Sequence, residues 1–213
     1  IKPDYLGKRV LVTAGATIEN IDGVRFISNR SSGKMGIAIA DAAYLRGAEV
    51  TLVAARTSAP IPKYITTVRA ETTAEMYDEV MRRVADNDII IKAAAPADYT
   101  PETSNGNKIK SDKLMLNLVK TKDIAKAVGE VKGDRKLIIF CAETERLIEH
   151  AKAKLSAKNA DMIIANDVTQ KGAGFDTDTN IVSVIERSGV IDELSIMPKT
   201  KLADIILDKI LKL

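Results

Sequence analysis

Short apolar segments alternate along this chain with segments of helical composition, and this alternation constrains the fold more than any other feature. "RVLVTAG" starts at Arg9 and is rich in β-branched residues, so Arg9–Thr13 is predicted to be a strand. "GKMGIAIADAAYLR", residues 33–46, is alanine-rich and is followed by Gly47, a residue typical of helix C-termini. "EVTLVAA", residues 49–55, predicts a second strand. This order indicates a βαβ unit with a right-handed crossover.

The same alternation continues to the end of the chain. Residues 72–87 predict an amphipathic helix with Met76, Val80 and Val84 on one face, and residues 88–95 predict a buried parallel strand. Further strands are predicted at 114–119, 136–144, 161–167 and 180–186, and further helices at 121–131 (with Thr121 as N-cap), 145–158 and 199–211. The order indicates an α/β fold with a doubly wound, mostly parallel sheet flanked by helices.

Length is compatible with one large domain, because single cores split only beyond about 250–300 residues and the chain has 213. Residues 1–7 are interpreted as a linker remnant and residues 8–213 as the domain. The chain starts with Ile1 instead of methionine, which suggests a processed product or a piece excised from a longer protein.

Composition indicates a cytoplasmic protein without a membrane partner. No apolar run approaches the ~20 residues needed to cross a bilayer, and no signal peptide opens the chain. The single cysteine, Cys141, cannot form an internal disulfide, which fits a reducing compartment. The 32 basic and 29 acidic residues are mixed along the chain, which argues against a nucleic-acid-binding surface.

Polar and glycine-rich stretches follow several of the predicted strands. They are "AGATIENIDGVRFISNRSSGKMG", "AAAPADY" with the lysine-rich loop behind it, "FCAETE" and "ANDV". Ligands in open α/β sheets bind at the carboxyl ends of the strands, so these stretches predict one common site.

The stretch "RFISNRSSGKMG", residues 25–36, leads directly into a predicted helix. A helix N-terminus leaves backbone N–H groups unpaired and favours anions, and Ser31, Ser32 and Gly33 offer capping hydroxyls and close backbone approach. Three basic side chains add positive charge: Arg25, Arg30 and Lys34. The stretch therefore predicts a phosphate site, although a helix cap with a solvated loop also accounts for it.

Residues 96–113 have no periodicity and form a long predicted loop, which we expect to be flexible and to belong to the active site. Its lysines Lys108, Lys110 and Lys113 suit a flap that closes over phosphates, or else a solvated run of charge. Asp98 could bind a metal–phosphate complex or cap a turn.

Several common chemistries are disfavoured. "GATIENIDG" does not match G-x-G-x-x-G, and "SSGKMG" lacks the upstream glycine of a P-loop. Cys141 is expected to be a small buried apolar group, and the single histidine, His150, a solvated surface residue. Positioning, lysines, amide groups and a hard cation remain, which indicates phosphoryl or nucleotidyl transfer.

Together these motifs resemble one family. "KRVLVTAGAT", "IDGVRFISNRSSGKMGIAIA", "RGAEVTLV", "AAAPADY", "KIK", "AETE" and "ANDV" followed by "GF" are similar to phosphopantothenate–cysteine ligase. This is the synthetase half of the bifunctional coenzyme A biosynthesis protein of bacteria and archaea. The resemblance extends from about Lys8 to the end of the chain and implies a Rossmann-like fold.

The resemblance implies a ligase that joins cysteine to 4′-phosphopantothenate. The carboxylate first attacks CTP to give an acyl-cytidylate and pyrophosphate, and the amino group of cysteine then displaces CMP. It also implies Mg²⁺, a homodimer, and a phosphopantothenoylcysteine decarboxylase domain fused in front or associated. Nothing matches the flavin-binding decarboxylase half, so no FMN is expected here.

The resemblance also assigns roles to residues. Asn29 would orient the acyl carbonyl or intermediate, Arg25 would hold phosphopantothenate, and the backbone of Ala94 and Ala95 would contact the substrate. Lys108 would close on the triphosphate as a catalytic residue, and Asp98 would lie at the metal. The implied nucleotide-binding residues are Ala94, Asp98, Lys108, Thr121, Lys122, Asp123, Ile124, Phe140, Lys154 and Lys158.

This chain departs from bacterial relatives at Pro96, where they usually have valine, at Thr121-Lys122, where they have Asn-Pro, and at "IFCAET", where they commonly have "GFAAET". "AGAT" and "AAAPADY" look more like archaeal members. Two alternatives stay open: an NADP-dependent Rossmann-like oxidoreductase, in which Arg56 after the second strand would hold the 2′-phosphate, and a non-catalytic nucleotide-binding relative.

Overall fold

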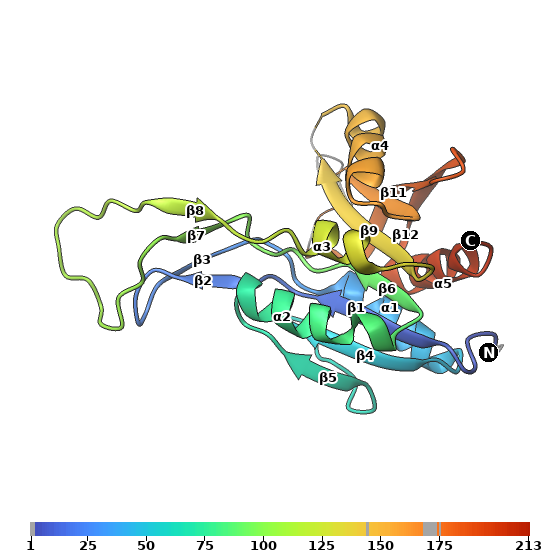
Figure 1. Cartoon of the computed structure of the whole chain (residues 1–213), viewed down its shortest axis with the longest axis horizontal. Helices are drawn as coiled ribbons and strands as arrows, with labels where there is room; N and C mark the ends of the chain where they lie inside the picture. The colour runs from blue at the N-terminus through green and yellow to red at the C-terminus, as the bar shows by residue number, and fades with distance from the viewer. Residues whose placement is uncertain (1–2, 144, 168–173, 175) are drawn as a thin grey trace.

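A computed structural model of the chain describes residues 3–143, 145–167, 174 and 176–213. The described residues form one eight-stranded main sheet in the order β12-β11-β10-β9-β6-β1-β4-β5 (Figure 1). The strands are β1 Arg9–Ala14, β4 Glu49–Ala54, β5 Thr66–Arg69, β6 Ile89–Lys92, β9 Lys136–Glu143, β10 Met162–Asp167, β11 Thr179–Glu186 and β12 Ile191–Pro198. All neighbours from β5 to β10 are parallel, and β11 and β12 pair antiparallel.

The strand order reverses at β1. The chain runs outward from β1 through β4 to β5, and then starts again with β6 on the other side of β1. Such a topological switch point is where open α/β sheets bind ligands. The predicted doubly wound, mostly parallel α/β fold is confirmed, while β5 and β12 were missed.

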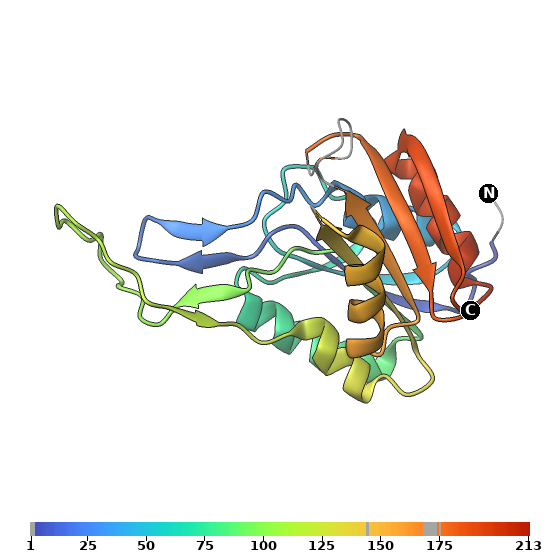
Figure 2. The same cartoon turned by 90° about the horizontal axis from the view of Figure 1, so that it is seen from above.

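Helices cover both faces of the sheet (Figures 1 and 2). On one face lie α1 Lys34–Leu45 and α5 Lys199–Ile210, and on the other α2 Thr73–Arg83, which ends in the short 3₁₀ helix η1 Val84–Asp86, α3 Ile124–Val131 and α4 Leu147–Ala157. Alternate strand residues feed the two cores: Val10 and Val12 face α1, whereas Leu11 faces the α2 side. This two-sided burial explains the continuous apolar runs of the central strands.

Helix ends follow local sequence signals in most places. Gly47 adopts φ 92° just after α1, as its predicted capping role requires. Thr72 and Glu75 form a capping box at the start of α2. The predicted N-cap of α3, Thr121, is wrong. Asp123 caps the helix by accepting from the Lys126 N–H at 3.0 Å, and Thr121 instead donates its hydroxyl to the Ala97 carbonyl.

Core packing reaches further towards the N-terminus than the expected domain start at Lys8. Tyr5 is fully buried, and its hydroxyl donates to the Leu207 carbonyl of α5 at 2.7 Å. Asp4 forms an ion pair with Arg46. Residues 4 and 5 therefore belong to the folded domain and not to a linker.

Two antiparallel ribbons project from the body, and we call them together the arm (residues 18–28 and 99–120). One ribbon pairs β2 Ile18–Asn20 with β3 Phe26–Ser28, and the other pairs β7 Tyr99–Pro101 with β8 Leu118–Lys120. Both views show them extending beyond the sheet (Figures 1 and 2). The strand predicted at 114–119 is therefore wrong in length and place. Only Leu118 and Val119 of that range lie in a strand, β8, which pairs with β7 in the arm and not with the main sheet.

Among the helices that the structure describes, none combines the length and apolar character needed to span a bilayer.

Candidate active site

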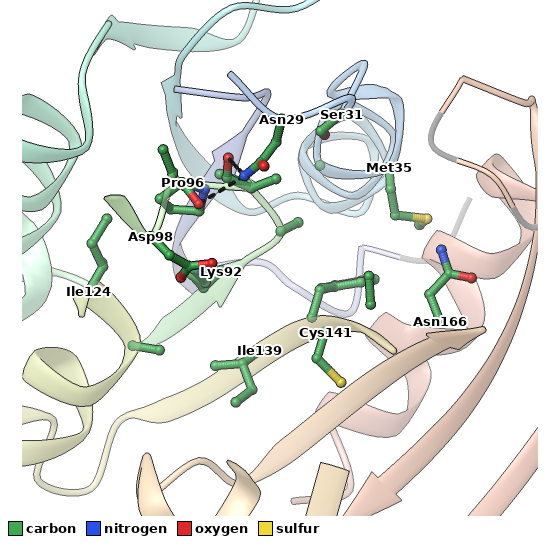
Figure 3. A pocket seen from close by; sticks show the side chains of 18 of the residues that line it. Asn29, Ser31, Met35, Lys92, Pro96, Asp98, Ile124, Ile139, Cys141 and Asn166 are labelled. Atoms are coloured by element: carbon green, nitrogen blue, oxygen red, sulfur yellow. Dashed lines mark hydrogen bonds between the residues drawn. The ribbon is translucent and has the colours of Figure 1, made fainter. Parts of the chain in front are cut away.

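A pocket of about 980 Å³ opens at the carboxyl ends of the central strands (Figure 3). Its walls come from the loop before α1, the segment after β6, the start of α3, the ends of β9 and β10, and α4. Parts of all four polar stretches that the sequence predicted would meet are among them, but residues 100–119, with the lysine-rich loop, do not line the pocket. The volume is at the upper end of the range typical of small-molecule and cofactor sites.

Buried threonines hold the segment after β6, "AAPA", in place. The Ala94 N–H donates to Thr13 Oγ1 at 3.1 Å and the Ala97 N–H donates to Thr17 Oγ1 at 2.8 Å. The Thr17 hydroxyl also bonds that of Thr73 at 2.8 Å. Because these partners are buried and satisfied, the backbone of this segment is a rigid wall on which a ligand can be positioned.

Asn29 reaches across the pocket mouth to this wall. Its Nδ2 donates to the Ala95 carbonyl at 3.1 Å and to the Pro96 carbonyl at 3.0 Å (Figure 3). The predicted substrate residues Asn29, Ala94 and Ala95 are therefore brought together. Both contacts are to backbone carbonyls, so the position of Asn29 does not depend on whether residue 96 is proline, as here, or valine, as in bacterial relatives.

The start of α1 forms one end of the pocket. Gly33 precedes the helix with φ 79°, and no side chain caps it. The predicted capping by Ser31 and Ser32 is therefore not observed; Ser31 Oγ only accepts a long bond from the Gly33 N–H at 3.4 Å. Because the first-turn N–H groups of a helix lack intrahelical partners, this end can bind an anion.

Two lysines stand at the same end. Lys34 pairs with Asp178 at 2.9 Å, and this bond raises the lysine's pKa. Lys199 is buried and donates to the Thr177 carbonyl; burial, with help from Lys34, lowers its pKa. Both line the pocket together with Asn166 and Asn180.

The opposite end carries the residues implied for nucleotide binding. Thr121, Lys122, Asp123, Ile124, Lys154 and Lys158 line it, as does Asp98, whereas Phe140 lines the pocket but packs against the core on the α1–α5 side. Lys158 forms an ion pair with Asp123, and burial lowers its pKa while the Asp98 carboxylate opposes that shift. Lys122 lies over the Tyr77 ring, with Nζ 4.5 Å from the centroid.

Arg25 and Lys108 do not line this pocket. Arg25 lies on the arm, where its Nε donates to Asp22 at 3.0 Å and its Nη2 to the Ile109 carbonyl at 2.9 Å. Lys108, beside Ile109, is exposed. The structure thus brings these two predicted site residues near each other and away from Asn29 in the same chain.

The sequence did not predict three features of the pocket. They are the buried threonines that bond the segment after β6, the group of Lys199, Asn166 and Asn180 at the α1 end, and Lys92. A lysine directly after the apolar run "III" was the available signal for Lys92. Cys141 lines the pocket and is only partly buried, which differs from the predicted buried apolar group, and His150 is exposed on α4 as predicted. Three motif residues, Thr144, Val168 and Phe175, lie outside the described residues.

Within the described part of the chain, no cluster of three or more His, Cys, Asp or Glu side chains is arranged to hold a metal ion. The pocket combines backbone N–H groups and lysines at one end with further lysines at the other. This arrangement suits an extended ligand with several negative charges.

Comparison with known proteins agrees with this geometry. The family model described as DNA/pantothenate metabolism flavoprotein C-terminal domain matches residues 5–213. The coenzyme A biosynthesis bifunctional protein CoaBC of Bacillus subtilis (strain 168) is 44% identical over 96% of this chain and 51% of its own length. A protein from an unknown prokaryotic organism, named cysteine/cysteine sulfinic acid decarboxylase, is also 44% identical, over 97% of this chain and 59% of its own length.

A crystal structure of the C-terminal domain of a CoaBC protein superposes with a TM-score of 0.83 at 41% identity, and covers 96% of this chain and 94% of that one. The chain spans between half and three fifths of the length of the curated relatives it matches. A match over nearly all of its residues, by family model and by relatives, shows that this chain belongs to the family of the DNA/pantothenate metabolism flavoprotein C-terminal domain, the C-terminal domain of the CoaBC proteins.

Proposed function

We propose that this domain is the CTP-dependent ligase that joins L-cysteine to 4′-phosphopantothenate in coenzyme A biosynthesis. The observation that carries the proposal is a pocket in which Asn29, bonded to the Ala95 and Pro96 carbonyls, lies together with the uncapped start of α1 and a lysine-lined end. Membership in the CoaBC family supports the same pathway.

In the first step a carboxylate oxygen of phosphopantothenate attacks the α-phosphorus of CTP, and the bond to pyrophosphate breaks. In the second step the cysteine nitrogen attacks the acyl carbon, the amine loses a proton, and CMP leaves with the electron pair. The protein's part is positioning and charge stabilisation. The α1 end suits the phosphates that leave, because its N–H groups and Lys34 and Lys199 offer donors and positive charge.

Asp98 suits a role in holding Mg²⁺ together with nucleotide phosphates. Its side chain is exposed at the pocket wall, and carboxylate and phosphate oxygens are the ligands that Mg²⁺ prefers. Bound there, Mg²⁺ would neutralise charge on the triphosphate.

The first experiment measures pyrophosphate release from the purified chain with phosphopantothenate and Mg²⁺, comparing CTP with ATP and adding or omitting cysteine. We expect release with CTP to become catalytic only when cysteine is present. If pyrophosphate is released with ATP but not with CTP, the proposed nucleotide changes from CTP to ATP. If folded protein releases no pyrophosphate with either nucleotide, the chain is a non-catalytic relative.

Asn29→Asp tests the mechanism at one residue. A carboxylate at this position loses both Nδ2 bonds to the Ala95 and Pro96 carbonyls and brings negative charge next to the reacting carboxylate, so amide formation should fall by about 100-fold or more while CTP still binds. Calorimetry and single-turnover assays separate the two effects. Normal turnover by this variant would contradict the assigned role.

The domain is proposed to act as a homodimer through its arm. Several large apolar side chains of the arm are exposed: Val24, Phe26, Tyr99, Leu114, Met115, Leu118 and Val119. Exposed apolar patches of this kind mark protein interfaces. In a dimer, Arg25 and Lys108 on the arm can serve the pocket of the other chain.

Mixed dimers test this arrangement. Asn29→Asp and Lys108→Met chains should each be inactive, but a mixture should regain activity, because one pocket per dimer then has Asn29 from its own chain and Lys108 from the other. If the mixture stays inactive although mixed dimers form, Lys108 acts on its own chain's pocket.

The structure gives no support for the NADP-dependent oxidoreductase alternative, which depended on Arg56. Arg56, the residue expected to hold a 2′-phosphate, does not line the pocket, and its guanidinium lies 5.7 Å from the centre of the Phe26 ring. Since the relatives are much longer than this chain, a decarboxylase domain fused or associated in the natural protein is part of the proposal, as is a cytoplasmic location.

A further inference from the structure

Lys92 is the last residue of β6, and its side chain lines the pocket (Figure 3). Ile90, two residues earlier, belongs to the core on the α2–α3–α4 side, so Lys92 leaves the sheet on that same side. Its register neighbours are Thr13 on β1 and Ile139 on β9. Lys92 therefore stands in the middle of the sheet, at the switch point, and not at its edge.

Three other lysines of the pocket are engaged within the chain. Lys158 pairs with Asp123, Lys122 lies over Tyr77, and Lys34 pairs with Asp178. For Lys92, by contrast, the described residues provide neither a hydrogen bond nor an ion pair. The Asp98 carboxylate acts on it only through longer-range attraction, and Lys154 and Lys158 oppose that effect.

Desolvation lowers the pKa of Lys92 to about 8, so the ammonium still carries its charge at neutral pH. Lys92 is half-buried at the pocket wall, and a partly desolvated cation without a hydrogen-bonded partner is available to a ligand that supplies the partner. The lysines that line this part of the pocket are 92, 120, 122, 154 and 158, against Asp98 and Asp123, so an excess of positive charge is left for an anion.

We infer that Lys92 binds the α-phosphate of the nucleotide, and through it the CMP leaving group of the second step; this rests on the proposed ligase function. Its strand lies between β1, which leads to the start of α1, and β9, which lies in the chain between α3 and α4, the helices flanked by Asp123 and Lys158 at the nucleotide end. A nucleotide that spans both ends of the pocket would place its α-phosphate over this central strand. The ammonium then stabilises the charge that CMP takes with it when the acyl–oxygen bond breaks.

The test compares the wild-type chain with Lys92→Met, which keeps length and apolar stem but removes the charge. Isothermal titration is done with CMP, Mg–CTP and pyrophosphate as separate probes. We expect Lys92→Met to weaken CMP and Mg–CTP by roughly 10- to 100-fold and pyrophosphate by less than about 2-fold. Lys63→Met, at an exposed position away from the pocket, is the matched control and should change none of them.

Each outcome bears on a different statement. Unchanged CMP affinity in Lys92→Met, or an equal loss for pyrophosphate, overturns the assignment to the α-phosphate. Wild-type protein that binds neither CMP nor CTP overturns the proposed function itself.

Thermal unfolding without ligand excludes a merely structural role. Because the variant removes a desolvated charge, its Tm should be equal to or above that of wild type. A lower Tm together with loss of all three ligands would show that Lys92 supports the fold instead, and would contradict the inference.

Discussion

The sheet body and the arm of this chain are stabilised by different means. In the body, two cores of fully buried aliphatic residues lie on either side of the central strands. In the arm, several large apolar residues are exposed, and Met115 reaches 90% exposure. Burial of apolar side chains therefore stabilises the body within one chain, whereas the exposed apolar side chains of the arm are available for contacts with another chain.

One buried carboxylate organises the arm. Asp22 accepts from the N–H groups of Val24, Arg25 and Ile109 at 2.8–3.1 Å, and it pairs with the Arg25 guanidinium. It thereby ties the β2–β3 turn to the loop that carries Lys108. Hydrogen bonds therefore position the arm, whereas burial of apolar side chains stabilises the body.

The largest expected effect is a difference in unfolding free energy between a leucine of the body and a leucine of the arm. Leu52→Ala removes a fully buried side chain of β4 and should cost about 2–5 kcal/mol of unfolding free energy. Leu118→Ala in the arm, where the residue is 45% exposed, should cost within about 0.5 kcal/mol in the monomer. Denaturant unfolding at low protein concentration measures both, and equal losses would remove the distinction between the regions.

The next effect concerns Asp22 itself. Asp22→Asn keeps the shape but loses the charge and one acceptor, so the arm should open while the body stays folded. Hydrogen exchange should rise at the amides of Val24 and Ile109 and stay unchanged in the buried strands. If global Tm fell as far as it does for Leu52→Ala, the arm would be part of the cooperative core.

Acid should act on the arm through the same group. The bonds with Arg25 hold the pKa of Asp22 well below its ordinary value in the folded chain. A depressed folded pKa means that the stabilisation is present above the unfolded pKa of about 3.9 and is lost as pH falls further, towards the folded pKa. Exchange at the Ile109 amide should therefore rise below about pH 4 in wild type, and this added rise should be absent in Asp22→Asn.

The smallest effect is expected at the junction of the two regions. Arg56 of the body lies over the ring of Phe26 on β3, 5.7 Å from its centre. Phe26→Leu keeps an apolar group but removes the cation–π contact, which is worth about 0.5–1 kcal/mol at exposed sites. Amide exchange in β2 and β3 should increase slightly; no change there would show that Asp22 alone positions the arm.

Much of the body was predictable because its signals are local. The apolar runs from Arg9, Glu49 and Ile89, and the alanine-rich helix that Gly47 ends, come from neighbouring residues in the chain. The short strand β5 was missed because only four residues are extended, and the α3 cap because Thr121 and Asp123 both carry capping side chains. Tertiary contacts, here the Ala97 carbonyl, decided between them.

The candidate site shows the same division. The motif residues Asn29, Ala95 and Asp98 line one pocket, since the carboxyl ends of parallel strands meet there. Arg25 shares its motif with Asn29 yet lies on the arm, because proximity in sequence does not reveal that the chain turns through the β2–β3 hairpin just before Asn29. Lys108, from a separate motif, lies on the arm beside Ile109, whose carbonyl accepts from Arg25.

The fold class and the family could be predicted from the amino-acid sequence, because strand and helix periods and ordered motifs are properties of neighbouring residues. Only the tertiary structure decided that Lys92 faces the pocket without a hydrogen-bonded partner among the described residues, and that Asp22 joins two distant loops. Burial and pairing depend on which remote residues meet, and long-range packing alone sets those meetings.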